Sequence, residues 1–162
     1  METSPVPKKK KYQRHTYVCP FDLILRAQVT SQHKNRDLLR SRLRKQLTCC
    51  NIDEITTSGL TALNQCVLDG NLESVKMFLE LGASVNKKDR YGWTPLHYAA
   101  NEGYLDICRY LLRNGAKVRV TNKEGKFPVE VAEDEVILRL LLRATLLYGM
   151  PPLDRESLST SI

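Results

Sequence analysis

Long apolar runs are absent from this 162-residue sequence: no stretch of eighteen apolar residues occurs, and none of the first thirty residues form a continuous apolar segment. A membrane-spanning helix needs about twenty mostly apolar residues, and a secretory signal needs an apolar core near its start. We therefore expect a soluble, intracellular protein.

Cysteine is also scarce, with five residues and no C-x-x-C spacing. An odd, unpaired set argues against a disulfide framework and against a structural zinc site. We interpret Cys66 and Cys108 as small core residues, and His97 as a buried hydrogen-bonding residue. A phosphate-binding glycine loop, a nucleophile–base pair and metal-ligand spacing are missing too, so we expect no enzyme and no cofactor.

Charge is unevenly distributed along the chain. Lysine and arginine total 25 against 18 acidic residues, but residues 1–50 hold 12 cations and only 3 anions. This asymmetry predicts a basic head attracted to acidic surfaces. Within it, Lys8, Lys9, Lys10 and Lys11 are typical of a nuclear import signal, and a solvated, disordered head is the alternative interpretation. Binding of nucleic acid is not expected, because no recognised DNA-binding motif occurs.

A periodicity of about 33 residues runs through the centre of the chain, and such a period is typical of repeat architectures. Gly59, Gly92 and Gly125 are equally spaced, and residues 59–86 share nine identities with residues 92–119 over 28 positions. Each unit contains a short helical pattern, at 61–68 and 94–102, followed by a longer amphipathic one. Polar, turn-forming stretches at 86–92 and 119–125 separate the units and predict projecting, hairpin-like fingers.

The unit beginning at Gly92 resembles the ankyrin repeat, whose T-P-L-H signature appears as Thr94-Pro95-Leu96-His97. The resemblance implies an all-α ankyrin-repeat solenoid of three to four stacked helix pairs. We divide the chain into a basic head (1–20), a repeat domain (21–148) and a tail (149–162). The repeat domain comprises a degenerate repeat (21–58), two full repeats (59–91 and 92–124) and a shortened last repeat (125–148).

Repeat solenoids use their concave surface to hold other proteins, so we expect a protein-interaction adaptor. Aromatic, polar and charged residues around the second unit are the predicted partner-binding positions, since aromatic and arginine side chains anchor many interfaces. For Trp93, packing between repeats is an equal alternative. The predicted set comprises Lys87, Arg90, Tyr91, Trp93, Tyr98, Asn101, Glu102 and Tyr104.

The amino-acid sequence of the repeats, most specifically residues 59–135, is similar to the ankyrin block of type-1 protein phosphatase regulatory subunits. That resemblance implies the phosphatase catalytic subunit as a partner and a V-x-F docking motif before the first repeat. The corresponding place holds Val18 and Phe21, one residue too far apart, which turns Phe21 to the opposite side of an extended segment. The Notch-regulated ankyrin proteins are similar over 59–107, and they imply a nuclear transcriptional cofactor instead. Cytoplasm, nucleus or both are the expected locations.

The C-terminal end shows two further patterns. Residues 136–148 are apolar except for two arginines and a threonine, although a terminal helix should present a polar outer face. We expect the tail, a second copy of the chain or a partner to cover it. The last residues, Thr160, Ser161 and Ile162, match the C-terminal pattern that PDZ domains capture, which predicts a PDZ protein as a further partner.

Overall fold

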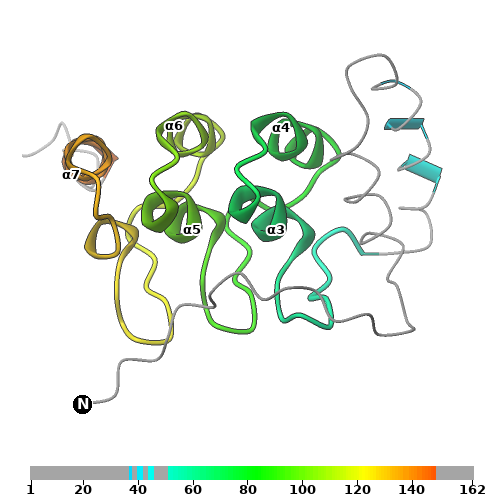
Figure 1. Cartoon of the computed structure of the whole chain (residues 1–162), viewed down its shortest axis with the longest axis horizontal. Helices are drawn as coiled ribbons and strands as arrows, with labels where there is room; N and C mark the ends of the chain where they lie inside the picture. The colour runs from blue at the N-terminus through cyan, green and yellow to red at the C-terminus, as the bar shows by residue number, and fades with distance from the viewer. Residues whose placement is uncertain (1–36, 38–39, 42–43, 46–50, 149–162) are drawn as a thin grey trace, which may run out of the picture.

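The computed structural model describes residues 37, 40–41, 44–45 and 51–148, and this part of the chain forms stacked layers of helices. Short helices and long helices make two parallel rows, and loops project as fingers beyond the row of short helices (Figure 1). We call residues 51–60, 84–93 and 117–126 the first, second and third fingers. The helices are α3 (Ala62–Leu68), α4 (Leu72–Glu80), α5 (Pro95–Glu102), α6 (Leu105–Arg113), the 3-10 helix η1 (Pro128–Glu130) and α7 (Glu135–Tyr148).

The helix boundaries follow from capping residues. Thr61 accepts a hydrogen bond from the Asn64 amide at the start of α3, and Asn71 accepts one from the Ser74 amide at the start of α4. Such caps satisfy backbone donors that the first helical turn leaves unpaired. Gly103 ends α5 in the left-handed conformation, with φ of +81°. The predicted short helices are therefore confirmed, with Thr61 and Thr94 as caps just outside them.

Equivalent glycines occupy equivalent corners of successive fingers. Gly59, Gly92 and Gly125 have φ values of +87°, +77° and +78°, a region that side chains with a Cβ rarely adopt. At Gly92 a Cβ atom would also lie 2.8 Å from the Lys123 backbone nitrogen of the next finger. The repeat period of the sequence is thus a period of the structure, and the predicted ankyrin solenoid is confirmed.

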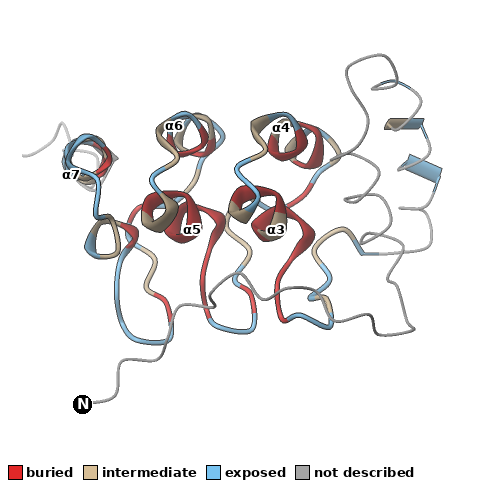
Figure 2. Cartoon of the chain, in the orientation of Figure 1, coloured by how far each residue is buried: buried red, intermediate tan, exposed pale blue. Residues whose placement is uncertain are grey.

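The core lies between the layers, where each helix pair packs on the next (Figure 2). Phe78, Leu111 and Leu141 are completely buried, one from each long helix. Cys66 and Cys108 are buried among these apolar side chains, as expected, and burial raises the pKa of the Cys108 thiol to about 12. Since the reactive form of cysteine is the thiolate, both residues act as small apolar core residues.

The region of the predicted degenerate first repeat is described only in part. Asp37, Arg40, Ser41, Arg44 and Lys45 are helical and lie within the range 21–58 assigned to the degenerate repeat. An ion pair joins the Arg40 guanidinium to Glu80 at the end of α4. This contact places the helical residues beside the first complete repeat. The remaining residues of 21–50, the head and the tail lie outside the described part of the chain.

In the last unit a single 3-10 turn, η1, stands where earlier units have a short helix, and α7 provides the long helix. One face of α7 packs on α6, but its outer face is apolar and exposed. Leu142 is 48% exposed and Leu146 is 71% exposed. None of the helices in the described part of the chain is both long and apolar enough to cross a membrane. The exposed leucines confirm the apolar outer face predicted for the last helix.

We predict very different costs for shortening two neighbouring leucines of α7. Leu141→Ala should lower the free energy of unfolding by about 2–5 kcal/mol, because it leaves a cavity against α6. Leu142→Ala, the matched control on the exposed face, should cost about 0.5 kcal/mol. Urea unfolding followed by circular dichroism measures both. Equal losses would mean that α7 is not oriented as described.

Candidate protein-interaction surface

The turn of the second finger is closed by the carboxylate of Asp89. Its Oδ1 atom accepts hydrogen bonds from the backbone amides of Tyr91 and Trp93, both at 2.9 Å. The Asp89 amide donates in turn to the Trp93 carbonyl at 3.0 Å, and Gly92 supplies the positive φ that the turn requires. Side chain and backbone together hold the finger in one conformation.

The other two fingers use the same turn with different side chains. Asn122 stands at the position of Asp89 in the next repeat, and its Oδ1 accepts hydrogen bonds from the amides of Glu124 at 2.9 Å and Lys126 at 3.0 Å. In the first finger, Thr56 donates its hydroxyl to the Leu60 carbonyl at 2.9 Å. All three turns therefore share a backbone geometry, and a polar side chain at the same position supports each of them.

Asp89 differs from its counterparts because its second carboxylate oxygen also accepts hydrogen bonds. Oδ2 accepts a hydrogen bond from the Tyr98 hydroxyl at 2.6 Å and a longer one from Asn64 at 3.4 Å. Burial raises the pKa of the Asp89 carboxyl, and the hydrogen bonds from Tyr98, Trp93, Tyr91 and Asn64 oppose that rise. Burial together with the neighbouring carboxylate raises the pKa of the Tyr98 hydroxyl well above its ordinary value.

The T-P-L-H signature links α5 to the third finger. The Nδ1 atom of His97 lies 2.8 Å from the Thr94 hydroxyl and 3.2 Å from its amide, which closes the capping box at the start of α5. Its Nε2 atom lies 3.0 Å from the Lys126 carbonyl and donates to it. His97 is fully buried, so the prediction of a hydrogen-bonding residue inside the fold is confirmed.

Asn64 takes the place of this histidine in the preceding repeat. Its Nδ2 atom donates to the Trp93 carbonyl at 3.3 Å, as His97 donates to the equivalent Lys126 carbonyl. Asn64 Oδ1 is buried and finds no hydrogen-bond partner among the described residues. The substitution therefore keeps the link between repeats but leaves one polar atom unsatisfied, a state that costs about 1–3 kcal/mol.

A second set of side chains connects the bases of neighbouring fingers. Asp53 Oδ1 accepts a hydrogen bond from the Ser84 amide at 2.9 Å. Asn86, at the same position of the next finger, accepts one from the Lys117 amide at 2.8 Å and donates to the Gly115 carbonyl at 3.1 Å. These contacts hold successive fingers at a constant spacing.

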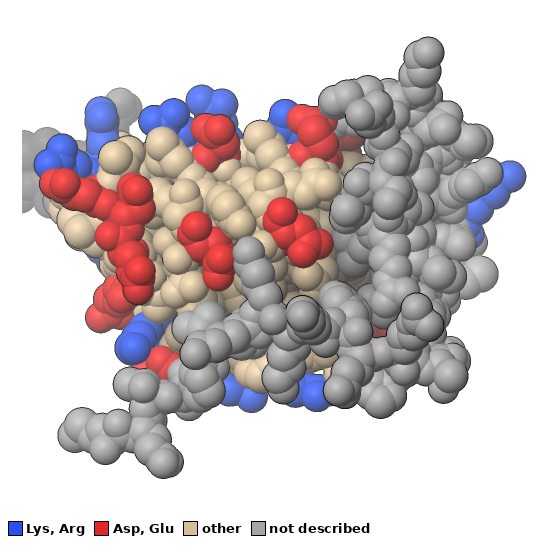
Figure 3. Space-filling view, in the orientation of Figure 1, with Lys and Arg blue, Asp and Glu red and all other residues tan. Residues whose placement is uncertain are grey.

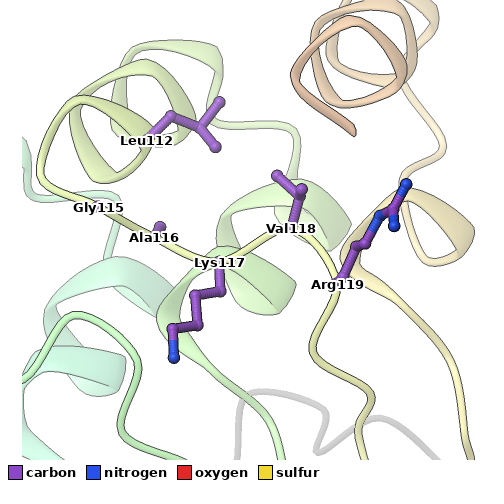
Figure 4. A pocket seen from close by; sticks show the side chains of 6 residues that line it. All are labelled: Leu112, Gly115, Ala116, Lys117, Val118 and Arg119. Atoms are coloured by element: carbon purple, nitrogen blue, oxygen red, sulfur yellow. The ribbon is translucent and has the colours of Figure 1, made fainter. Parts of the chain in front are cut away.

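At the third finger this series ends. Arg119 occupies the position of Asp53 and Asn86, and it lines an open hollow of about 320 Å³ beside Leu112, Gly115, Ala116, Lys117 and Val118. Figure 4 shows the Arg119 side chain directed toward α7 and the Lys117 side chain directed the opposite way. Among the described residues, no group of three or more His, Cys, Asp and Glu side chains could hold a metal ion.

The predicted partner-binding residues fall into three groups. Lys87, Arg90 and Tyr91 lie together on the second finger, and Tyr91 is 39% exposed at its tip. Trp93 and Tyr98 are buried, with ring centroids 4.9 Å apart. The prediction that Tyr98 contacts a partner on the surface is wrong, because its side chain is buried and its hydroxyl donates a hydrogen bond to Asp89. For Trp93 the structure shows the packing alternative.

The remaining predicted residues lie at the helix ends. Asn101, Glu102 and Tyr104 are half-buried around the turn between α5 and α6. The Tyr104 ring covers Gly70 of the preceding repeat so closely that a Cβ there would lie 2.9 Å from its Cζ atom. Tyr104 therefore helps to join two repeats. The docking pair Val18 and Phe21, the lysines 8–11 and the C-terminal residues 160–162 all lie outside the described part.

Charged side chains are unevenly distributed over the surface. In Figure 3 acidic side chains gather on the face where short and long helices meet, and basic side chains lie along the edge where the fingers project and along the opposite edge, at the row of long helices. The acidic zone includes Asp69, Glu73, Glu102 and Asp106, at the turns between short and long helices. Carboxylates in the first turn of a helix complement its dipole, so Glu73 and Asp106 also have a structural role.

Sequence reasoning missed the residues that hold the fingers. Asp89, Asn122, Asp53 and Asn86 were not among the predicted site residues, although the members of each pair lie one repeat period apart. The available signal was the recurrence of an Asp or Asn at a fixed place before the finger glycine. The sequence does not show that the Asp89 side chain accepts hydrogen bonds from the amides of its own turn, and this contact gives the recurrence its structural role.

Stacked helix pairs with projecting fingers define a repeat domain that holds protein partners on an extended surface. A family model described as "Ankyrin repeats (3 copies)" matches residues 28–122, more than half of the sequence. The chain belongs to the ankyrin-repeat family, and this part of it is a protein-interaction domain.

Individual relatives match over shorter stretches. Protein phosphatase 1 regulatory subunit 27 from Mus musculus is 50% identical over 44 residues, which are 27% of this chain and 29% of that protein. The same subunit from Homo sapiens is 51% identical over 41 residues, 25% of this chain and 27% of the relative. The Notch-regulated ankyrin repeat-containing protein from Homo sapiens is 42% identical over 61 residues, 37% of this chain and 54% of the relative. The chain thus spans under a third of the phosphatase subunits and about half of the Notch-regulated protein.

We predict that Asp89→Ala lowers the free energy of unfolding by about 3 kcal/mol, since a buried amide, a half-buried amide and a buried hydroxyl lose their acceptor. Asp89→Asn should cost less, because Asn122 holds the equivalent turn with a carboxamide. Tyr98→Phe is the matched control that removes only the hydroxyl, at a cost of about 1.5 kcal/mol. Urea unfolding measures all three, and a fully stable Asp89→Ala variant would contradict this account.

We also predict that mild acid destabilises the domain through His97. Burial is the main cause that lowers its pKa below the ordinary 6.5, and Lys88 adds to the effect. The unfolded chain therefore binds a proton more readily, so the contribution of His97 is complete above about pH 6.5 and is lost as pH falls below it. Asp89 acts in the opposite sense, because its raised pKa makes the folded state bind a proton at higher pH than the unfolded state.

The control for this pH effect is His97→Asn, which keeps a donor to the Lys126 carbonyl, as Asn64 does for Trp93, but does not titrate. The unfolding free energy of the native chain should fall more steeply between pH 7 and 5 than that of the variant, by up to about 1.4 kcal/mol per pH unit. Parallel curves for the two proteins would show that His97 does not titrate differently on unfolding.

Proposed function

We propose that this chain is a non-enzymatic adaptor that acts as a regulatory or targeting subunit of type-1 protein phosphatase. The observation that carries the proposal is its 50% identity over 44 residues to a protein phosphatase 1 regulatory subunit. An ankyrin domain suits such a role, because its function lies in a surface of preset shape and needs no catalytic group.

The rigidity of the fingers supports an adaptor role. Each turn is held by backbone hydrogen bonds and a polar side chain, and the contacts of Asp53 and Asn86 fix the distance between fingers. A surface that is already ordered loses little conformational entropy on binding. The exposed Tyr91 and the neighbouring Arg90 belong to the residue types that contribute most binding energy at interfaces.

The segment that precedes the repeats supplies the second contact in this proposal. Val18 and Phe21 would enter apolar pockets of the phosphatase, and His15 and Arg14 provide basic flanking residues. In an extended chain, residues three apart point to opposite sides, so this segment must bend to present both side chains. The proposal therefore assigns most of the recognition to the ankyrin surface.

A nuclear transcriptional cofactor is the second candidate function. It is favoured by the 42% identity over 61 residues to a Notch-regulated ankyrin repeat-containing protein, of which this match covers 54%. Lys8 to Lys11 would supply the import signal. This candidate places the protein in the nucleus, and the phosphatase role is compatible with the cytoplasm or the nucleus.

The phosphatase role is tested with the purified full-length chain and the purified type-1 catalytic subunit. We expect the two to co-elute from a size-exclusion column and to give saturable binding in calorimetry. Val18→Ala/Phe21→Ala should weaken binding, and Val6→Ala/Tyr12→Ala is the matched control in the same basic head. Absence of binding by the native chain would refute the phosphatase role.

The second candidate function, a nuclear transcriptional cofactor, is tested separately. Replacing Lys8 to Lys11 with alanine should move a fluorescently tagged chain out of the nucleus, because importins recognise clustered cations. A matched control removes the four cations Lys117, Arg119, Lys123 and Lys126 of the third finger instead. Equal nuclear signal for the native chain and the Lys8 to Lys11 variant would contradict this candidate.

A further inference from the structure

The second and third fingers together carry a concentrated positive charge. We call Lys87, Lys88, Arg90, Lys117, Lys123 and Lys126 the basic finger row; all but Lys87, which is half-buried, are exposed. The same two fingers contain only two carboxylates, Asp89 and Glu124. Asp89 is buried and occupied by its own turn, so Glu124 is the single exposed anion of these fingers.

Part of this charge is left without a partner inside the described structure. Lys88 donates to the Thr121 carbonyl at 2.7 Å and so ties the two fingers together, and Lys126 pairs with Glu124 at 3.3 Å. Within residues 51–148, Lys87, Lys117 and Lys123 make no ion pair. These three cations are therefore available to pair with an anionic partner.

The first finger is acidic, whereas the second and third fingers are basic. It contains Asp53 and Glu54 and no lysine or arginine, although its turn has the same backbone geometry. The basic row is therefore a property of two adjacent fingers and is not required by the ankyrin turn. An exposed aromatic residue, Tyr91, lies within the row, and its hydroxyl contacts the Ser58 carbonyl of the first finger at 3.4 Å.

From these observations we propose that the basic finger row is the docking surface for an acidic polypeptide segment of the partner. This inference rests on the proposed adaptor function and specifies the chemistry of its partner. The cations sit on turns that are held in place before binding, so attraction costs little ordering of the protein. Arg90 and Tyr91 add directional hydrogen bonding and apolar contact to a surface otherwise made of lysines.

The neighbouring acidic zone favours a short polypeptide over a nucleic acid. Glu102 is the last residue of α5 and Asp106 lies in the first turn of α6, and Figure 3 shows acidic side chains between the finger edge and the row of long helices. A nucleic acid carries a phosphate at every step and meets repulsion wherever it leaves the fingers. An acidic segment of a protein can end at the limit of the row.

The test uses the full-length chain and a fluorescent peptide of alternating Glu and Gly, with fluorescence anisotropy as the readout. The corresponding Gln and Gly peptide and an oligothymidylate are the comparison probes. We expect the Glu peptide to bind at low salt, to weaken steeply with added salt, and to bind more tightly than either comparison probe. No binding of the Glu peptide, or tighter binding of the oligothymidylate, would overturn the proposal.

Two charge-reversal variants separate a local surface from overall charge. Lys117→Glu/Lys123→Glu should weaken binding of the Glu peptide about tenfold or more. Arg109→Glu/Arg143→Glu changes the net charge equally, but on the exposed faces of α6 and α7, and should change binding little. Circular dichroism and the urea midpoint verify folding, and Lys117→Gln/Lys123→Gln replaces the first variant if that variant unfolds. Equal weakening by both reversals would overturn the proposal.

The outcome is distinguishable from that of the phosphatase experiment. If the chain binds the phosphatase catalytic subunit but not the Glu peptide, the docking proposal fails and the proposed function stands. If it binds the Glu peptide through the fingers but not the phosphatase, the phosphatase role fails and the acidic docking surface stands.

Discussion

Asp89 accepts hydrogen bonds from its own turn, from Tyr98 on α5 and from Asn64 on α3, and these contacts connect the finger to the helices behind it. A buried carboxylate is costly unless donors surround it, and here four donors do so. This arrangement makes the second finger both rigid and firmly placed. The backbone that carries the exposed Lys88 and Arg90 is held by that one buried anion.

The same logic explains why the equivalent position changes from repeat to repeat. Where Tyr98 is replaced by Val131, the finger uses Asn122, whose Nδ2 atom is buried without a partner among the described residues. A neutral carboxamide is the less costly choice there, because no hydroxyl is available to satisfy a second carboxylate oxygen. Each repeat therefore keeps the backbone of the turn and adjusts its side chains to its neighbours.

The last layer of the stack differs from the earlier ones. Asn86 bridges to the next finger, but Arg119 at the equivalent position borders an open hollow, and α7 presents Leu146 to solvent. A repeat buries its apolar face only against a neighbour, so the last layer of a solenoid exposes whatever side chains it carries. The apolar end and the basic fingers are distinct surfaces, and they suit different kinds of contact.

Much of this architecture could be predicted from the sequence alone. The spacing of Gly59, Gly92 and Gly125, the caps Thr61 and Thr94 and the apolar outer face of α7 all depend on local backbone preference and periodicity, which a linear sequence displays directly. The buried role of His97 followed from its place in a repeat signature. Arg90 and Tyr91, predicted to contact a partner, lie exposed on the second finger, and their role in binding stays a prediction.

The direction in which each side chain points was decided by the tertiary structure. Tyr98 follows His97 on the same short helix, and tyrosine is a residue type common at interfaces. Its hydroxyl nevertheless points toward Asp89, nine residues away in the sequence. Asp89 and Asn86 looked like ordinary turn residues, because Tyr98 and Lys117, with which they form hydrogen bonds, lie in the next repeat. Sequence periodicity thus determined the layers and their corners, whereas contacts between layers determined which polar groups are used inside the fold and which remain available to a partner.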